Sequence, residues 1–466
     1  LLKNPQIGLK PVAFLDDDPN KVGRRIGGFP VFGPLIQLAE VVVSQAVEEV
    51  LIAIPSAPAQ TTQNLKSICQ DIEVPYSTMP SLTSVLDYSS FSSSLYKVPM
   101  AMPDITTDEI QAVVRVMQSR NLSIGSQTNT LEELAADVAN AAHGVAVING
   151  TSALHLCMIA AGVGPGDEVI TSPYSFVASA NCALFQQATP VFVDIDPVTL
   201  NIDPNKIEAA INERTKAIIP VHIFGQPADM DPILEIADRH QLLVVEDSAE
   251  AVGAEYKGRK VGALGRAGVF AFYPNKQMTS GEGAVIVTND DEWADLFRSL
   301  RNQGRDVFNE WLEHARLGYN YRMSELNAAV GVVQIRRLEE LLHKRDVVAG
   351  KYNHMLAGFD HVSPLRVVPD TTRMSWFVYV VRFSPQIDRN LVMEGLAKRG
   401  IPTRPYFAPI HLQPFYQAQF GFKPGDFPQA EAAGRSTLAL PFHSNMNTAE
   451  IKVVIDSLSD VLHELT

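Results

Sequence analysis

Short apolar runs alternate with segments of helical periodicity along most of the chain. The runs predict buried strands at Glu168–Thr171, Pro190–Asp194, Ala217–Val221, Leu242–Val245, Gly268–Tyr273 and Ala284–Thr288. The periodic segments predict helices at Asp108–Gln118, Leu131–Ala142, from Asn149–Thr151 to about Ala161, Asn205–Ile211 and Pro232–His240. Such alternation is typical of an α/β fold, in which a mostly parallel sheet is covered by helices on both faces.

The C-terminal part has a different pattern. A helix of unusual length is predicted from about Ser324 to Leu356, and it closes a large domain over 99–356. A smaller α/β domain, 357–466, is predicted to contain a strand at Trp376–Phe383 and a helix at Asp388–Arg399. Residues 403–416 are so rich in proline that we expect no regular structure there.

The first 88 residues are predicted to be a separate α/β segment. Strands are expected within 11–19 and 48–56 and a short helix at Leu65–Ile72, and the serine-rich stretch Ser89–Ser94 indicates a linker over 89–98. The segment resembles the later part of the Rossmann-like domain of bacterial polysaccharide-biosynthesis proteins, without the glycine-rich phosphate turn. An acid at a strand end can hold a ribose hydroxyl, but without that turn we favour a solvated strand terminus for Asp16–Asp18. The chain starts with Leu1 rather than methionine, which is consistent with a start partway through a longer protein.

Composition narrows the class of protein. At 466 residues, 46% hydrophobic and 19% charged, the chain is an ordinary globular protein of two or three domains. Its net charge of −14 argues against nucleic acid or an anionic membrane as the main partner. The three cysteines, Cys69, Cys157 and Cys182, have no CxxC spacing, which excludes a disulfide or zinc framework and favours the cytoplasm. No apolar run is long enough to span a membrane, and no signal peptide is visible.

The candidate chemistry lies at two neighbouring strand ends. Asp247 follows one predicted strand, and Lys276 lies in a turn after the next. Either residue alone has an ordinary explanation, because aspartate commonly caps turns and helices and lysine is common in solvated loops. Together, a lysine that can bond to an aldehyde and a carboxylate that can hold a ring nitrogen protonated are what a pyridoxal 5′-phosphate (PLP) site requires.

The surrounding motifs favour the PLP interpretation. From about Pro103 to Thr466 the chain resembles the PLP-dependent sugar aminotransferases, a fold-type-I family that aminates keto-sugar nucleotides. The resemblance rests on NGTSALHL (149–156), SPYSFVASAN (172–181), VEDSAEA (245–251), FYPNKQMTSGEG (272–283), GYNYRMSELNAA (318–329) and RPYFAPIHLQPFY (404–416). The resembling region is roughly four-fifths of the chain, and the motifs follow one another in the family's order and spacing.

The resemblance implies roles for individual residues. It makes Lys276 and Asp247 catalytic, and it implies a homodimer in which the GYNYRM loop reaches the partner's cofactor. The residues that it implies for binding PLP are Gly150, Thr151 and Ser152 at the phosphate, Phe176 on the ring face, Asp247, Glu250 and Lys276 around the ring, and Asn320 and Arg322 from the partner's loop. Arg404, Tyr406 and His411 are candidates for the substrate, and no metal is expected.

Two positions depart from the family pattern. Glu250 stands where the family often has a glutamine, and Ala271 stands where many relatives have a phosphate-binding serine. The implied reaction is a ping-pong transamination from an amino acid, glutamate, to a keto-sugar nucleotide. Two alternatives are a sugar dehydratase, which Lys276 disfavours because those relatives have histidine there, and a PLP- or nucleotide-sugar-binding regulator without turnover.

Overall fold

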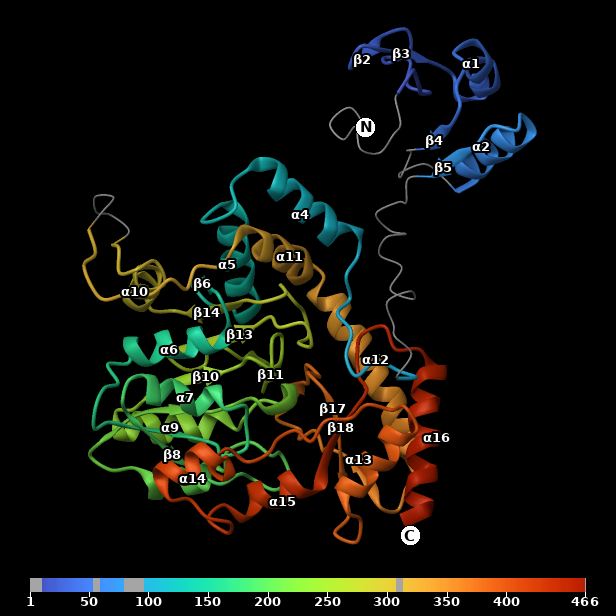
Figure 1. Ribbon diagram of the computed structural model, residues 1–466. Helices are drawn as coiled ribbons and strands as arrows, with labels where there is room; N and C mark the ends of the chain where they lie inside the picture. The colour runs from blue at the N-terminus through green and yellow to red at the C-terminus, as the bar shows by residue number, and fades with distance from the viewer. Residues whose placement is uncertain (1–10, 53–58, 79–95, 307–312, 466) are drawn as a thin grey trace. The chain divides into compact units, whose positions relative to one another are not determined.

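The chain forms two compact units, residues 1–93 and 94–466 (Figure 1). The computed structural model describes residues 11–52, 59–78, 96–306 and 313–465. The predicted linker segment Ser89–Ser94 lies outside the described residues. None of the helices in the described ranges combines the length and apolar character needed to span a bilayer.

In the described residues of the N-terminal unit, short strands alternate with helical segments. Its elements are β1 (Phe14–Leu15), β2 (Arg25–Ile26), β3 (Phe29–Phe32), α1 (Leu38–Ser44), β4 (Val50–Ile52), α2 (Ala59–Asp71) and β5 (Tyr76–Thr78). The acids after β1 bind neighbours within the same unit: Asp16 pairs with Lys21 in the following loop at 2.8 Å, and Asp17 Oδ1 accepts the N–H of Leu35, beyond β3, at 2.6 Å. These contacts agree with a strand terminus rather than a ribose site.

The second unit is built on a seven-stranded sheet. Its strands are β6 (His143–Val147), β7 (Glu168–Thr171), β8 (Thr189–Phe192), β9 (Thr215–Ile219), β10 (Leu243–Asp247), β13 (Ala267–Ala271) and β14 (Ala284–Thr288). Their order is β6-β14-β13-β10-β9-β7-β8, and only β14 runs antiparallel to its neighbours. The predicted mostly parallel sheet is therefore confirmed.

Helices cover both faces of this sheet because its strands are apolar on both sides. The helices on the sheet include α5 (Ser126–Ala139), α6 (Gly150–Ala160), α7 (Ala178–Phe185), α8 (Pro204–Ile207), α9 (Met230–His240) and α10 (Asp291–Arg301), whereas α4 (Thr107–Ser119) packs on α11 (Glu325–Arg336). Val245 and Val269 pack in the cluster formed with α6, α7 and α10, whereas their neighbours Val244 and Phe270 pack on the opposite face with α9 and α5.

The predicted long helix is two helices. The elements are α11 (Glu325–Arg336) and α12 (Leu338–Leu356), separated by Arg337, whose backbone (φ −96°, ψ 6°) leaves the helical region. The Arg337 guanidinium bonds Asp104 and Glu109, about 230 residues away in sequence. The break thus coincides with a long-range ion-pair network that periodicity does not reveal.

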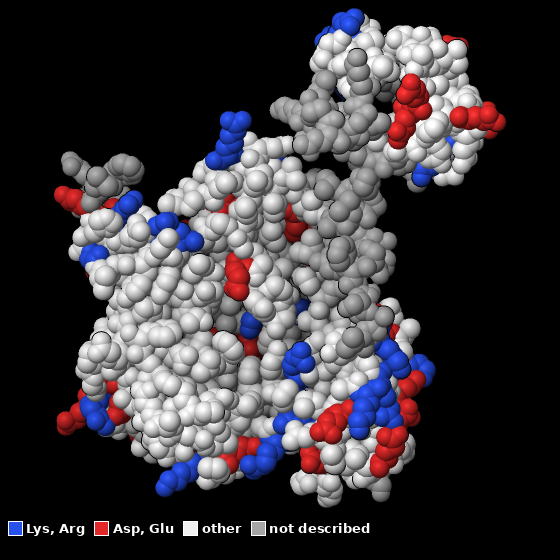
Figure 2. Space-filling view, in the orientation of Figure 1, with Lys and Arg blue, Asp and Glu red and all other residues white. Residues whose placement is uncertain are grey.

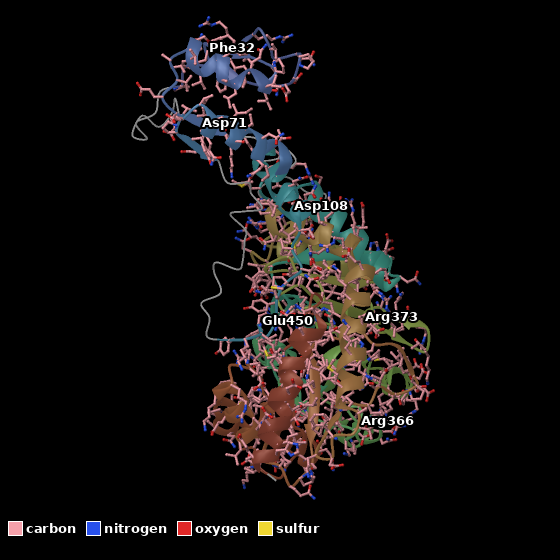
Figure 3. All side chains as sticks on the ribbon, turned by 90° about the vertical axis from the view of Figure 1, so that its right-hand side faces the viewer. Phe32, Asp71, Asp108, Arg366, Arg373 and Glu450 are labelled. Carbon is pink, nitrogen blue, oxygen red and sulfur yellow. The ribbon has the colours of Figure 1, made fainter. Side chains whose placement is uncertain are left out.

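The C-terminal part packs a small sheet against α12. Its elements are β15 (Val362–Pro364), β16 (Thr371–Arg373), β17 (Tyr379–Phe383), α13 (Arg389–Lys398), α14 (Pro414–Phe420), α15 (Pro428–Ser436), β18 (Thr437–Leu440) and α16 (Thr448–Leu465). β16 pairs with β11 (Glu255–Tyr256), itself paired with β12 (Arg259–Lys260). Arg373 donates to both carboxylate oxygens of Glu339 on α12, and Glu450 marks the first turn of α16 (Figure 3).

Two expectations for this part are wrong. Residues 403–416 were expected to lack regular structure, yet α14 begins at Pro414, because proline is tolerated in the first helical turn. Val98, predicted to lie in the linker, is buried in the core that α12, α13 and α16 form with the small sheet.

Loss of the Arg337 network is expected to destabilise the second unit. Burial alone would raise the pKa values of Asp104 and Glu109, but their hydrogen bonds and ion pairs outweigh it and lower both. Arg337→Met leaves Lys344 for Asp104 and Gln334 for Glu109, so we expect a loss of about 1–3 kcal/mol in the free energy of unfolding at pH 7.

Urea denaturation of the variant and its parent checks this expectation. Because the pKa values of Asp104 and Glu109 are lower in the folded than in the unfolded protein, their ionisation stabilises the fold at any pH above the unfolded-state pKa values. This stabilisation is lost as the pH falls through the folded-state pKa values. The difference in the free energy of unfolding between the parent and Arg337→Met should therefore shrink below about pH 4. A difference that is absent at pH 7, or that does not change with pH, would contradict the role assigned to these ion pairs.

Candidate active site

The predicted site lies at the carboxyl ends of two adjacent parallel strands. Asp247 is the last residue of β10 and pairs in register with Val269 of β13. The chain leaving β13 carries Lys276 in a segment, 272–283, without helix or strand. Open α/β sheets bind ligands at this edge, because loops from neighbouring strands diverge there.

Asp247 is buried and oriented by its neighbours. Its Oδ2 accepts the Ser179 hydroxyl at 2.6 Å, and its Oδ1 accepts the Ala249 N–H at 3.2 Å. Two buried thiols, Cys157 and Cys182, lie near Asp247. Their pKa values are raised mainly by burial, and the negative charge of Asp247 adds to the increase. Each carboxylate oxygen of Asp247 can accept a further hydrogen bond, so this buried acid is suited to a ligand with an N–H donor.

Lys276 lies between an acid and an aromatic ring. Its Nζ is 3.6 Å from Glu250 Oε1 and 4.0 Å from the centroid of the Phe377 ring. Glu250 is buried and accepts the Phe224 N–H on Oε2 at 3.0 Å. Burial raises the pKa of Glu250, and the positive charge of Lys276 opposes that increase. The unusual glutamate is therefore a direct neighbour of the lysine.

The start of α6 closes another side of the site. Asn149 caps the helix by accepting the Ser152 N–H at 2.9 Å, and a Cβ added to Gly150 would come within 3.1 Å of the Ala271 side chain at the end of β13. The N–H groups of Gly150 and Thr151 lie in the first turn, where a helix supplies no acceptor and its dipole favours an anion. Ala271 has no hydroxyl to add to them.

Phe176 lies in the loop before α7 with 59% of its surface exposed. Its carbonyl accepts the N–H of Ser179, the residue whose hydroxyl binds Asp247. The loop thus links an exposed aromatic ring to the buried acid, and such a ring is available to stack on a planar ligand.

Asn320 and Arg322 are held by a third residue, Asn302. Asn320 forms a backbone bridge with Asn302, and Arg322 Nη1 donates to the Asn302 side chain at 3.1 Å. Between them, the Tyr321 carbonyl accepts the N–H of Ile148, two residues before α6. The GYNYRM segment therefore lies beside the start of α6, and no described contact joins Asn320 or Arg322 to Lys276 or Asp247.

The three substrate candidates have different surroundings. Tyr406 is half-buried, and burial, followed by the charge of Glu250, raises its pKa, which places it near the site. Arg404 is exposed and donates to the carbonyl of Thr403. His411 is fully buried, 3.2 Å from Glu431 with its ring against Phe427, and it has no surface to offer a substrate.

Sequence reasoning missed three residues of this site, Ser179, Phe224 and Phe377. Ser179 lies within the SPYSFVASAN motif, so its position in a matched motif was the available signal. Phe224 lies in a tight turn with φ +57°, and Phe377 comes from the C-terminal part of the chain. Neither has a local pattern that indicates a role.

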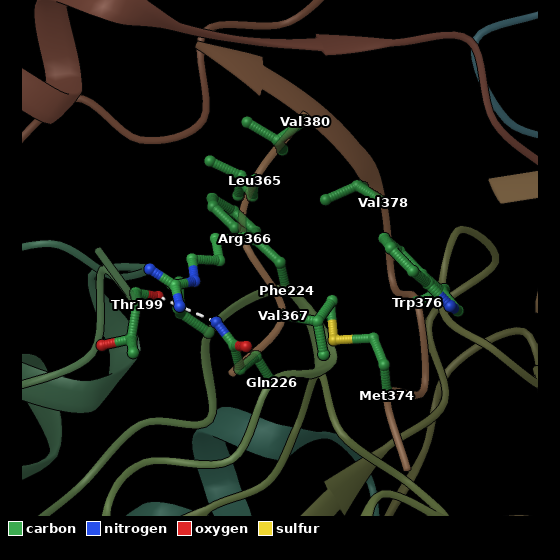
Figure 4. Close-up of a pocket in the computed structure, with 11 residues that line it drawn as sticks. Thr199, Phe224, Gln226, Leu365, Arg366, Val367, Met374, Trp376, Val378 and Val380 are labelled. Carbon is green, nitrogen blue, oxygen red and sulfur yellow. Dashed lines mark hydrogen bonds between the residues drawn. The ribbon is translucent and has the colours of Figure 1, made fainter. Parts of the chain in front are cut away.

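A small apolar cavity of about 10 Å³ lies at the junction between the large sheet and the C-terminal part (Figure 4). Phe224, Gln226, Met374 and Trp376 line it, and the Gln226 amide donates to the Thr199 carbonyl at 3.3 Å. Its lining includes neither Lys276 nor Asp247, so we assign this cavity to the junction rather than to the site.

The residues at the sheet edge fit PLP. The site provides an amine for the aldehyde, a buried carboxylate for the ring nitrogen, a helix start for the phosphate and an exposed aromatic for the ring face. On the face shown in Figure 2, basic and acidic side chains are interspersed, so an anionic ligand must rely on local donors such as these.

Residues 103–459 match the model of the DegT/DnrJ/EryC1/StrS aminotransferase family. The chain belongs to this family. The GDP-perosamine synthase of Caulobacter vibrioides is 43% identical over 79% of this chain and all of its own length. The spore coat polysaccharide biosynthesis protein SpsC of Bacillus subtilis is 39% identical over 78% of this chain and 97% of its own.

Solved structures of the family superpose well on this aminotransferase. Spr1654 of Streptococcus pneumoniae, solved in a PLP form, gives a TM-score of 0.76 at 29% identity over 80% of this chain and all of its own. The predictions of a fold-type-I sugar aminotransferase and of PLP as its cofactor are thereby confirmed.

Proposed function

We propose that this aminotransferase transfers the amino group of glutamate to a keto group on a nucleotide-linked sugar, for polysaccharide or glycan biosynthesis. The observation that carries the proposal is the placement of Lys276 and Asp247 at adjacent strand ends, beside the start of α6. The relatives named for GDP-perosamine and for spore coat polysaccharide support a nucleotide-linked amino sugar as the product.

Different residues of the chain are assigned to cofactor binding and to proton transfer. PLP, when bound, supplies an electron sink for the carbon that loses its proton. Asp247, which is buried, would hold the ring nitrogen in its protonated form, and the N–H groups of Gly150 and Thr151 would bind the phosphate. Phe176 would stack on the ring, and Lys276 Nζ would take the proton from the Cα atom of the amino donor.

Glu250 supports this cycle because it lies 3.6 Å from Lys276 Nζ. A buried carboxylate beside the amine stabilises the positive charge that Nζ acquires with the proton. In this proposal the sugar nucleotide would meet the phenol of Tyr406, on which the Glu250 charge acts, and the exposed guanidinium of Arg404.

Transfer of labelled nitrogen tests the proposal. The protein, PLP and ¹⁵N-glutamate are incubated with a panel of keto-sugar nucleotides, and products are separated by mass. The expected result is one nucleotide sugar that gains ¹⁵N, with 2-oxoglutarate formed in equal amount. If PLP and a sugar nucleotide bind but no nitrogen moves, the protein is a binding protein rather than an enzyme.

We further propose that the enzyme works as a cytoplasmic homodimer. Large apolar side chains are exposed on the second unit: Ile124, Phe176 and Leu317 have 62%, 59% and 84% of their surface accessible. Exposed apolar groups of this size are characteristic of interaction surfaces, and two-fold dimers are the commonest assembly. All three cysteines are free, which suits a reducing compartment.

Complementation between two inactive variants tests the dimer. If Arg322 of one subunit binds the cofactor phosphate of the other, mixing Lys276→Ala with Arg322→Ala subunits should restore up to about a quarter of the parent activity, because random exchange makes about half of the dimers mixed, each with one intact site. Activity is measured after subunit exchange has been verified by mass. Mixed dimers without activity would exclude a shared site through Arg322, and an active monomer would exclude the dimer.

A further inference from the structure

Arg345 is a buried cation held by backbone carbonyls. It lies in the middle of α12 with 3% of its surface exposed, and it donates to the carbonyl oxygens of Lys276 at 2.8 Å and of Trp376 and Phe377 at 3.1 Å each. Within the described ranges no carboxylate lies at ion-pair distance from it. Burying a charge without an oppositely charged partner lowers the stability of the folded protein, so we infer that Arg345 is kept for a role other than stability.

Two of its three acceptors belong to residues at the catalytic amine. One belongs to Lys276 itself, in a loop that no strand or helix fixes. Another belongs to Phe377, whose ring centroid lies 4.0 Å from Lys276 Nζ. A single guanidinium therefore sets both the backbone that carries the amine and the aromatic ring that faces it.

We propose that Arg345 is a positioning residue for Lys276, which fixes Nζ for its reaction with the cofactor and for proton transfer. This inference rests on the proposed function of Lys276. The role requires arginine, because a planar guanidinium offers five donors in a fixed fork, whereas a lysine ammonium offers a single centre that cannot span carbonyls from two chain segments. Burial lowers the pKa of Arg345 to about 10, so the side chain stays charged at neutral pH.

The chain offers a matched control in Arg389 at the start of α13. Its guanidinium also binds two carbonyls, Thr437 at 2.7 Å and Gly434 at 3.0 Å, and burial lowers its pKa as well. None of its described contacts involves Lys276, so Arg389→Met removes a half-buried fork bound to carbonyls without touching the site.

The test compares Arg345→Lys, Arg345→Met and Arg389→Met with the parent protein. Two measurements use the apoprotein. The first is the rate at which Lys276 bonds to added PLP; the adduct is reduced with borohydride and quantified by peptide mass. The second is the rate at which trinitrobenzenesulfonate labels Lys276. Both Arg345 variants should capture PLP at least about tenfold more slowly, since a misplacement near 1 Å can cost about 100-fold. The kcat should fall while the KM for glutamate stays within about twofold, and Lys276 labelling should change only in the Arg345 variants.

Each outcome decides between a positioning and a purely structural role. Parent-like capture in either Arg345 variant overturns the proposal, as does an equal defect in Arg389→Met at the same loss of thermal stability. If Arg345→Met does not fold, the PLP-capture rate of Arg345→Lys alone distinguishes the two roles. If neither variant folds, Arg345 is purely structural. Failure of the parent protein to capture PLP through Lys276 would instead overturn the proposed function.

Discussion

Replacing Lys276 with alanine is expected to abolish transamination. The change removes the amine that bonds to the cofactor and the base that moves the donor's proton. Loss of general acid–base catalysis alone costs about 10²–10⁴-fold, and loss of covalent attachment adds to it. The measurement is ¹⁵N transfer from glutamate, together with the mass of the protein after borohydride reduction with PLP.

A surface lysine provides the control for this substitution. Lys452 pairs with Asp456 on the exposed side of α16, and such pairs contribute little to stability. Lys452→Ala should retain parent activity and the reduced PLP adduct, whereas Lys276→Ala should lose both while keeping its circular dichroism. Turnover in Lys276→Ala within about tenfold of the parent would show that another group performs the catalysis.

Replacing Asp247 with asparagine is expected to leave PLP bound but to slow the reaction by about 100-fold or more, a loss typical of removing a designed electrostatic contact. Asparagine has the same shape, although only one of its two terminal atoms is an acceptor: its oxygen can accept the Ala249 N–H, and its NH2 group can then donate to the Ser179 hydroxyl oxygen. It carries no charge, however, so it cannot keep the ring nitrogen protonated. The rates of the glutamate half-reaction in variant and parent provide the measurement.

Ser179→Ala separates the charge of Asp247 from its orientation. This variant keeps the carboxylate and removes only the hydroxyl that binds Oδ2 at 2.6 Å. Its rate should fall much less than that of Asp247→Asn. If Asp247→Asn retained full activity but bound PLP poorly, or if Ser179→Ala were the slower of the two, Asp247 would be a structural cap rather than the partner of the ring nitrogen.

The sheet was predictable because its strands are buried on both faces. Such strands appear in the sequence as short apolar runs with polar ends, and two of them, Glu168–Thr171 and Ala284–Thr288, have the predicted bounds in the structure. Asp247 and Lys276 could be singled out for the same reason, since strand ends were visible and catalytic groups gather there.

The remaining features depend on contacts between distant parts of the chain. The break at Arg337 coincides with ion pairs to Asp104 and Glu109, and the surroundings of Lys276 depend on Arg345 and Phe377. A sequence displays periodicity within an element, but it does not show which side chain of a later helix will meet an earlier loop. His411 illustrates the opposite error, because its matched motif suggested a substrate contact and its burial excludes one.

The half-reaction of the unmutated protein shows whether PLP held by Lys276 receives the amino group of glutamate. Protein loaded with PLP is mixed with glutamate in the absence of any sugar, and both the cofactor absorbance and free 2-oxoglutarate are followed. We expect a change in absorbance and release of one 2-oxoglutarate for each occupied Lys276, after which the reaction stops. Unchanged absorbance with no 2-oxoglutarate, in protein shown to hold PLP on Lys276, would contradict an aminotransferase that uses glutamate.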